Sequence, residues 1–166
     1  MAETAFVIEP GRQDIVMIRH FDAPPDVVFR VVTDPELVPR WWGPHVLATR
    51  VDRMEVRPGG RWRFVNIDAH GREYGFCGVY HDVVAPERFV RTWAFEGMPG
   101  EVALATVTLA AAGGGTRYTA QSVHQSVEAR DAVVRGDAAR GGTEAMDRLA
   151  VLLADRRPPC DAGIAE

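Results

Sequence analysis

The sequence predicts an α+β fold in which a curved antiparallel sheet of seven strands wraps around one long C-terminal helix. Three observations support this prediction. Strand-like runs follow one another between residues 45 and 125, and short turn clusters separate them. Two proline-led helix starts precede those runs. The last third of the chain carries an apolar stripe with three- and four-residue spacing, which is typical of a helix packed on one face.

The N-terminal part predicts one strand and two short helices. The run at 15–21 begins with apolar residues on both faces, and the two prolines after it end the strand. The second of them, Pro25, suits the first turn of a helix, because its missing N–H would have no partner there. We expect this helix to end near Thr33. A proline directly after Asp34 repeats the start signal, so a second short helix is expected to reach about Arg40.

Six further strands are expected between turn clusters rich in glycine and proline. The longest of them would extend roughly 36 Å at about 3.3 Å per residue, well beyond a typical strand, so we expect the sheet to curl. The six expected strands are 45–56, 61–68, 74–84, 88–96, 102–110 and 116–125.

Two helices are expected after the sheet. Ser126 is placed to cap a short helix that ends at Arg135, and Asp137 is placed to cap a final helix that reaches about Ala154. The expected organisation of the chain is a flexible leader at 1–13, a single domain at 14–154 and a disordered tail at 155–166.

Several short motifs occur in the order that one known superfamily shows: Trp41-Trp42-Gly43-Pro44, Pro58-Gly59-Gly60-Arg61-Trp62, Gly78-Val79-Tyr80, and Gly142-Thr143 before Met146-Asp147-Arg148-Leu149. Over about residues 14–154 the chain resembles the START-like superfamily and, within it, the bacterial branch named after the activator of the ninety-kilodalton heat-shock protein's ATPase. The resemblance implies a helix-grip fold with a cavity between sheet and helix. Relatives often carry a bulky aromatic after the glycine of the final helix. Thr143 stands there instead, so we expect more empty volume.

The composition excludes several classes of function. The net charge is −4 and no basic run occurs, so we expect no nucleic-acid partner. All nineteen basic residues are arginine, which excludes catalysis through a lysine Schiff base. The five histidines do not share the spacing with cysteines or carboxylates that a metal site requires, so we expect neither a metal nor a cofactor.

The two cysteines, Cys77 and Cys160, do not form the pattern of a disulfide framework, which favours a reducing compartment. The N-terminus carries acidic residues and no long apolar stretch, which argues against a signal peptide. No segment approaches the roughly twenty apolar residues that a membrane crossing requires. We therefore expect a cytoplasmic location without membrane insertion.

Alternation along the strands sorts the aromatic side chains into rows on one face of the sheet. If these rows face the helix, they build a mostly apolar chamber that suits a small molecule. The alternative is that the rings fill the interior, and small residues at inward positions, Gly78, Ala120, Gly142 and Ala145, favour incomplete filling. The candidate ligand-binding residues are Trp41, Trp42, Trp62, Phe64, Phe76, Tyr80, Trp93, Phe95, Tyr118, His124, Met146 and Leu149.

Three polar side chains on these rows are candidates for catalysis. His124 shares a face with Ser122 and Tyr118, where a buried imidazole could transfer a proton. The alternative is a histidine with satisfied hydrogen bonds near a strand end. Arg91 would need a carboxylate or a ligand oxygen if it pointed inward. We favour a position at the rim of the sheet, where its guanidinium reaches water.

These features favour a non-enzymatic protein that binds or transports a small hydrophobic or aromatic molecule. One alternative is an enzyme resembling polyketide cyclases or hydratases that uses the same cavity. Another, taken from the family name, is a regulator of a chaperone ATPase with a role in the stress response. Because only one domain type of that activator is matched, we expect no chaperone partner. A homodimer formed through a sheet edge or through the exposed helix near Trp41 is a further hypothesis.

Overall fold

A computed structural model describes residues 2–156 of the chain as one antiparallel sheet and its helices, in the strand order β1-β2-β8-β7-β6-β5-β4-β3. The strands are β1 (Ala5–Val7), β2 (Asp14–Phe21), β3 (Ala48–Met54), β4 (Arg61–Ile67), β5 (Glu73–Val84), β6 (Arg88–Phe95), β7 (Ala103–Ala112) and β8 (Gly115–Val123). The helices are α1 (Pro25–Val32), the 3₁₀ turn η1 (Val38–Arg40), α2 (Val127–Arg135) and α3 (Ala138–Ala154).

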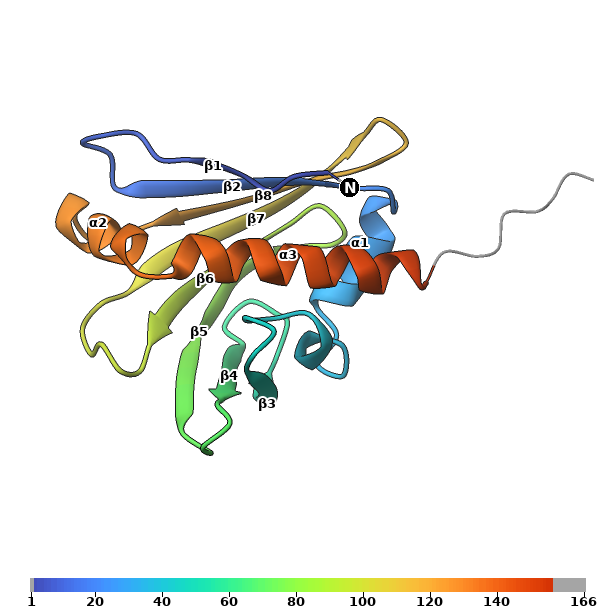
Figure 1. Cartoon of the computed structure of the whole chain (residues 1–166). Helices are drawn as coiled ribbons and strands as arrows, with labels where there is room; N and C mark the ends of the chain where they lie inside the picture. Colours follow the sequence, from blue (N-terminus) through green and yellow to red (C-terminus); the bar gives the residue numbers. More distant parts are fainter. Residues whose placement is uncertain (1, 157–166) are drawn as a thin grey trace, which may run out of the picture.

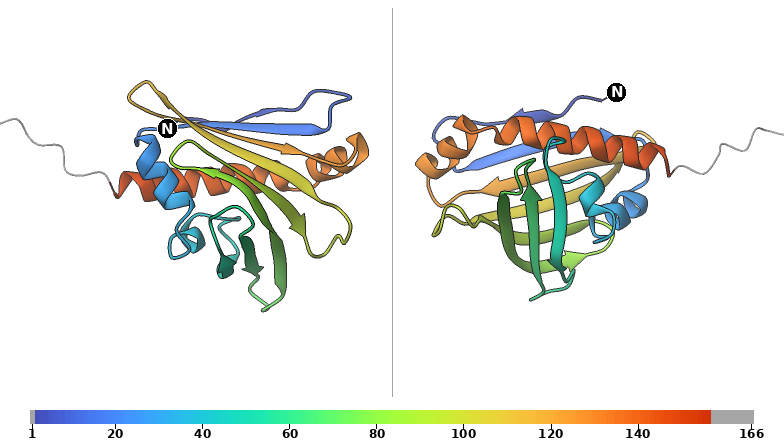
Figure 2. Two further views of the ribbon diagram at one scale, coloured as in Figure 1. Left: turned by 180° about the vertical axis from the view of Figure 1, so that it is seen from behind. Right: turned by 60° about the horizontal axis from the view of Figure 1, so that its bottom comes forward.

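Helix α3 lies along the concave face of the curved sheet, as Figures 1 and 2 show. The strands fan out behind it, α1 lies near its C-terminal end, and α2 lies near its N-terminal end. This arrangement confirms the predicted α+β fold with a C-terminal helix gripped by a sheet. Among residues 2–156, no helix combines the length and the apolar character that crossing a bilayer requires.

The sheet has eight strands rather than the predicted seven, because residues 5–7 form an edge strand. Ala5 pairs with Ile18 and Val7 pairs with Val16, so part of the predicted flexible leader belongs to the sheet. A strand of three residues is too short to show the alternation from which strands are predicted. The pairing of β1 with β2 was therefore found only in the structure.

The second predicted helix is also corrected, since it is only the 3₁₀ turn η1. Asp34 Oδ1 accepts a hydrogen bond from the backbone N–H of Glu36 at 2.9 Å, and the chain then turns without completing an α-helix. Pro39 has no N–H, so it removes one of the bonds that an α-helix over this segment would need. The turn leads directly into the two tryptophans at 41 and 42.

The predicted curl of the sheet has a local cause in β5. The register between β5 and β6 shifts between Tyr80 and Asp82, and such an irregularity bends a strand. At Gly78 the backbones of the two strands come so close that an added Cβ would lie 1.9 Å from the carbonyl oxygen of Thr92. The small size of Gly78 therefore permits this close approach and does not create free volume.

The last two helices begin and end close to their predicted positions. The Ser126 hydroxyl accepts a hydrogen bond from the backbone N–H of Ala129 at 3.0 Å, as predicted for a helix cap. Asp137 precedes α3 but its side chain caps nothing, because its backbone is not in the extended conformation that capping residues usually adopt. Asp155 and Arg156 follow α3, and the remainder of the predicted tail, 157–166, lies outside the described residues.

Candidate functional site

The face that α3 turns toward the sheet changes character along the helix. Its C-terminal half presents large apolar side chains, among them Met146 and Leu149, which are 2% and 0% exposed. Its N-terminal half presents only small ones, namely Ala138, Ala139 and Gly142. Because the sheet continues past both halves, the small residues leave space between α3 and the strands.

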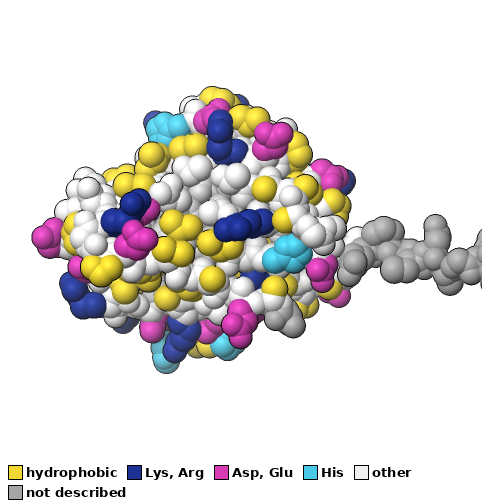
Figure 3. Space-filling model, turned by 90° about the horizontal axis from the view of Figure 1, so that it is seen from above, with side chains coloured by type: hydrophobic (Ala, Val, Ile, Leu, Met, Phe, Trp, Pro, Cys, Tyr) yellow, Lys and Arg dark blue, Asp and Glu magenta, His cyan; other side chains and the backbone are white. Residues whose placement is uncertain are grey.

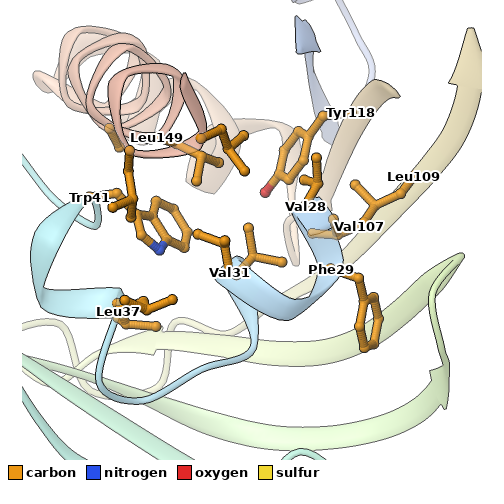
Figure 4. Packing of buried hydrophobic residues seen from close by; sticks show 14 of the residues in the cluster. Val28, Phe29, Val31, Leu37, Trp41, Val107, Leu109, Tyr118 and Leu149 are labelled. Atoms are coloured by element: carbon orange, nitrogen blue, oxygen red, sulfur yellow. The ribbon is translucent and has the colours of Figure 1, made fainter. Parts of the chain in front are cut away.

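The C-terminal half closes one end of the molecule. Figure 4 shows Trp41 and Tyr118 pointing toward Leu149 of α3, with Val28 and Val31 of α1 beside them. Trp41 and Tyr118 are each only 5% exposed. We call this region, where α1, η1 and the C-terminal half of α3 pack on the sheet, the closed end.

The N-terminal half of α3 covers a hollow of about 270 Å³, which we call the β1 lobe. Phe6 of β1 lies over Gly142, with its Cζ 3.4 Å from the position that a Cβ on this glycine would take. The lobe is lined by Phe6, Ile8, Ile15, Met17, Trp93, Ala103, Ala105, Ala120, Gln121, Ser122, His124, Val133, Val134, Ala138, Ala139 and Gly142.

A second hollow of about 380 Å³ adjoins the first and reaches the loop between β6 and β7; we call it the hairpin lobe. It is lined by Phe76, Trp93, Phe95, Met98, Glu101, Val102, Ala103, His124, Ala129, Ala132, Val133, Gly136, Asp137 and Ala138. Five residues line both lobes: Trp93, Ala103, His124, Val133 and Ala138. The lobes are therefore neighbours that share part of their walls, and together we call them the α2–α3 cavity. Met98 and Val102 lie at its exposed side, with 47% and 41% of their surface accessible.

The structure divides eleven of the twelve predicted ligand-binding residues into two groups. Four line the α2–α3 cavity: Phe76, Trp93, Phe95 and His124. Seven belong to the buried core: Trp41, Trp62, Phe64, Tyr80, Tyr118, Met146 and Leu149. Trp42 is partly buried, with its ring 5.2 Å from that of Phe64 and 5.1 Å from that of Phe76. The aromatic rows therefore face the helix, and both predicted outcomes, filling and lining, occur in different places.

The tryptophan pair is held in place by Arg148 of α3. Its guanidinium donates to the carbonyl oxygens of Trp42 and Gly43 at 3.2 and 3.0 Å, and to that of Pro39 at 3.3 Å. Gly43 adopts a φ of +80°, and an added Cβ would lie 2.9 Å from Asn66 Oδ1. This position therefore requires glycine, and the motif that contains it anchors the closed end.

Arg91 is the clearest departure from the sequence-based expectation, because it lies among aromatic rings and not at the rim. Its guanidinium carbon is 4.2 Å from the centre of the Trp62 ring, within reach of a cation–π interaction. One of its Nη atoms lies 3.4 Å from the Tyr80 hydroxyl, and its buried Nε has no partner among the described residues. The register places Arg91 opposite Tyr80 on the inward face.

The three catalytic candidates do not share one place. His124 lines both lobes of the cavity, whereas neither Tyr118 nor Arg91 is among the described lining residues. Burial raises the pKa of Tyr118 to about 12. Burial also lowers the pKa of His124, and the positive charge of Arg130 lowers it further. His124 is therefore a neutral imidazole at neutral pH, with Nε2 3.4 Å from the Ser122 hydroxyl.

Sequence reasoning missed many lining residues, and about half of these are alanine, glycine or serine. Ala103 and Ala105 lie two positions apart on one strand, so their side chains share a face, and this spacing could have identified them as lining residues. The prediction considered mainly aromatic residues and therefore left them out. Phe6 and Ile8 lie in the segment that was expected to be a leader. Val133 lies on the short helix before α3. Among residues 2–156, no three or more histidines, cysteines and carboxylates come together as a metal site would require.

On the side where β1 and β2 lie, a hollow of about 310 Å³ beside the C-terminal half of α3 is lined in part by charged side chains, among them Arg19 and Asp22. Figure 3, which looks onto that side from above, shows hydrophobic side chains spread between charged and other polar ones. One large continuous apolar patch would indicate a protein interface. The scattered arrangement makes the α2–α3 cavity the stronger candidate.

Comparison with known proteins gives a family and a set of related folds. Residues 22–154 match the family described as activator of Hsp90 ATPase homolog 1-like protein. No curated protein matches the chain. A crystal structure of a protein from Rhodobacter sphaeroides is similar to the chain with a TM-score of 0.85 and 28% identity, over 92% of this chain and 99% of that one.

Two further structures agree with this fold. A protein from Nitrosomonas europaea has a TM-score of 0.78 and 26% identity, over 87% of this chain and 96% of that one. The AHSA1 protein from Silicibacter pomeroyi has a TM-score of 0.73 and 23% identity, over 87% of this chain and 99% of that one. The last similarity concerns the fold alone.

Proposed function

The chain belongs to the family of activator of Hsp90 ATPase homolog 1-like proteins, which has the START-like fold, and we propose that it binds or carries a small hydrophobic or aromatic molecule. Members of this family often bind hydrophobic ligands. The single observation that carries the proposal is the α2–α3 cavity, whose two adjoining lobes have volumes of about 270 and 380 Å³. Volumes of this order suit small organic molecules.

The lining of the cavity supports an apolar ligand. Trp93, Phe76 and Phe95 offer aromatic rings, and alanines and valines make up much of the rest. At about 25 cal/mol per Å², covering roughly 300 Å² of apolar ligand surface stabilises the complex by about 7 kcal/mol before association costs. A free energy of about 7 kcal/mol corresponds to a Kd of about 10 μM, so these costs make the binding weaker than that.

Binding is better supported than catalysis. A general acid or base needs a partner that activates or receives the reacting group. Among the described side chains, Ser122 alone lies within hydrogen-bond reach of the His124 ring, at a long 3.4 Å, and the side chains of Tyr118 and Arg91 are placed elsewhere. We therefore propose a non-enzymatic binder. The expected absence of a chaperone partner and the hypothesis of a homodimer both stay predictions.

Titration with the neutral fluorescent probe N-phenyl-1-naphthylamine tests the proposal. Ala105 lines the β1 lobe, and Ala105→Leu would fill part of it. Ala110 lies on the same strand with an exposed side chain, so Ala110→Leu is a matched control. We expect the wild-type protein and Ala110→Leu to bind the probe equally. We expect Ala105→Leu to bind it at least about tenfold more weakly, because the added side chain keeps roughly 50 Å² or more of the probe's apolar surface from being buried.

The proposal fails if the wild-type protein does not enhance the fluorescence of the probe. It also fails if Ala105→Leu, shown to be folded by circular dichroism, binds as tightly as the control. A second panel of hydrophobic compounds, monitored by the shift in melting temperature, separates a poor probe from an absent site, because any bound ligand stabilises the folded state.

A further inference from the structure

The α2–α3 cavity contains one pair of inward polar side chains at the junction of its lobes. Ser122 lines the β1 lobe and His124 lines both lobes. The Ser122 hydroxyl and His124 Nε2 are 3.4 Å apart, which is long for a hydrogen bond. Both atoms therefore retain the capacity to bind a polar atom of a ligand. Gln121, the neighbour in sequence, differs because its amide donates to Asp14 Oδ2 at 2.9 Å.

The charges around this pair disfavour an anionic ligand. Among the described lining residues of both lobes, none is an arginine, and the chain contains no lysine. The charged residues that do line the cavity are the carboxylates Glu101 and Asp137. Moving a carboxylate from water into an apolar space without a cation costs several kcal/mol. A fatty or aromatic acid would therefore bind poorly here.

Arg130 is the arginine whose positive charge acts on His124, and its side chain is already engaged. Its Nε lies 2.7 Å from the Asp131 carboxylate, and its Nη1 donates to the carbonyl oxygen of Glu9 at 2.9 Å. It is only 2% exposed and does not belong to the described lining of either lobe. Arg130 helps to keep His124 neutral, but no free guanidinium reaches the cavity from it.

A neutral imidazole and a serine hydroxyl together offer donors and acceptors that suit a hydroxyl or carbonyl group. Because His124 stands where the lobes adjoin, the polar atom would lie in the middle of the ligand, with one apolar arm in each lobe. Building on the proposed function, we infer that the cavity selects a neutral molecule with two apolar arms joined by a carbon that carries one hydroxyl or carbonyl group, held by Ser122 and His124.

Three compounds that differ only at their central carbon test this inference by competition against N-phenyl-1-naphthylamine. They are 1,3-diphenylpropan-2-ol with a hydroxyl, 1,3-diphenylpropane with no polar group, and 2-benzyl-3-phenylpropanoate with a carboxylate. We expect the alcohol to bind about three- to tenfold more tightly than the hydrocarbon, which corresponds to a net hydrogen bond. We expect the carboxylate to bind at least about tenfold more weakly than the alcohol.

The variant Ser122→Ala tests whether the polar pair causes the tighter binding of the alcohol. It should reduce the preference for the alcohol over the hydrocarbon, since one of the two polar partners is lost while the apolar contacts remain. Thr108→Ala removes an exposed hydroxyl on the outer face of β7 and should keep the preference. The inference is overturned if the three compounds bind equally, if the carboxylate binds most tightly, or if Ser122→Ala keeps the preference. Equal binding leaves the proposed function intact, whereas no binding of any compound overturns both.

Discussion

Helix α3 crosses one sheet, but its two halves meet that sheet in different ways. At the closed end, Leu149 is fully buried and touches a core to which α1 and Trp41 also contribute. At the other end, which we call the open end, Ala138, Ala139 and Gly142 line the α2–α3 cavity. The comparison teaches that the size of the residues along one helix face decides where a gripped helix stabilises the fold and where it leaves a binding site.

The largest expected effect compares the removal of side-chain volume at the two ends. Leu149→Ala should lower the free energy of unfolding by about 3 kcal/mol, because it creates a cavity in a filled core. Val133→Ala, at the wall of an existing hollow, should cost less than about 1 kcal/mol. Urea unfolding followed by circular dichroism measures both. Equal losses for the two variants would contradict the distinction between a closed and an open end.

The reverse change, adding volume, should show the opposite asymmetry. Ala145 is 7% exposed and packs in the core, so Ala145→Leu should destabilise the protein by about 2 kcal/mol through overpacking. Ala139 lies on the same helix and lines the β1 lobe. Ala139→Leu should therefore lower the free energy of unfolding by less than about 0.5 kcal/mol, or raise it. The distinction would be broken if Ala139→Leu destabilised as much as Ala145→Leu.

The smallest expected effect concerns pH at the open end. His124 has a pKa below its usual value of 6.5, mainly because of burial. Its neutral form is favoured in the folded state, so its contribution to stability is complete above pH 6.5 and is lost as the pH falls through the lowered pKa. Urea unfolding at pH 7.5 and 5.5 should show a smaller loss on acidification for His124→Gln than for the wild-type protein. The same loss in both would show that His124 is not the group responsible.

Much of the fold was predictable because short local sequence patterns mark where its strands and helices end. Glycine and proline clusters end strands wherever they occur, so the bounds of β4 to β6 fell within one residue of their predicted positions. The edge strand β1 was not predictable, since three residues are too few to show the alternation of apolar and polar side chains that indicates a strand. The α-helix predicted after Asp34 was wrong because Pro39, two positions before Trp41, interrupts its hydrogen bonds.

The candidate site was predictable only in part. Alternation sorted the aromatic side chains into rows and left open which way the rows face; Trp93 and His124, which belong to two of these rows, line the cavity. Whether a ring lines a hollow or fills it depends on the distance between helix and sheet, which no local pattern contains. Arg91 shows the same limit, because its position over Trp62 depends on the register of β5 and β6 at the irregularity after Tyr80.

The most direct test of the two-ended description is an NMR titration of alanine-methyl-labelled protein with N-phenyl-1-naphthylamine. Ala105, Ala120 and Ala138 line the cavity, whereas Ala145 packs in the core of the closed half of the helix. We predict dose-dependent methyl shifts and ligand contacts at the first three and little change at Ala145. Shifts centred on Ala145 or on Ala23 near α1, with unchanged signals at Ala105, Ala120 and Ala138, would contradict the description.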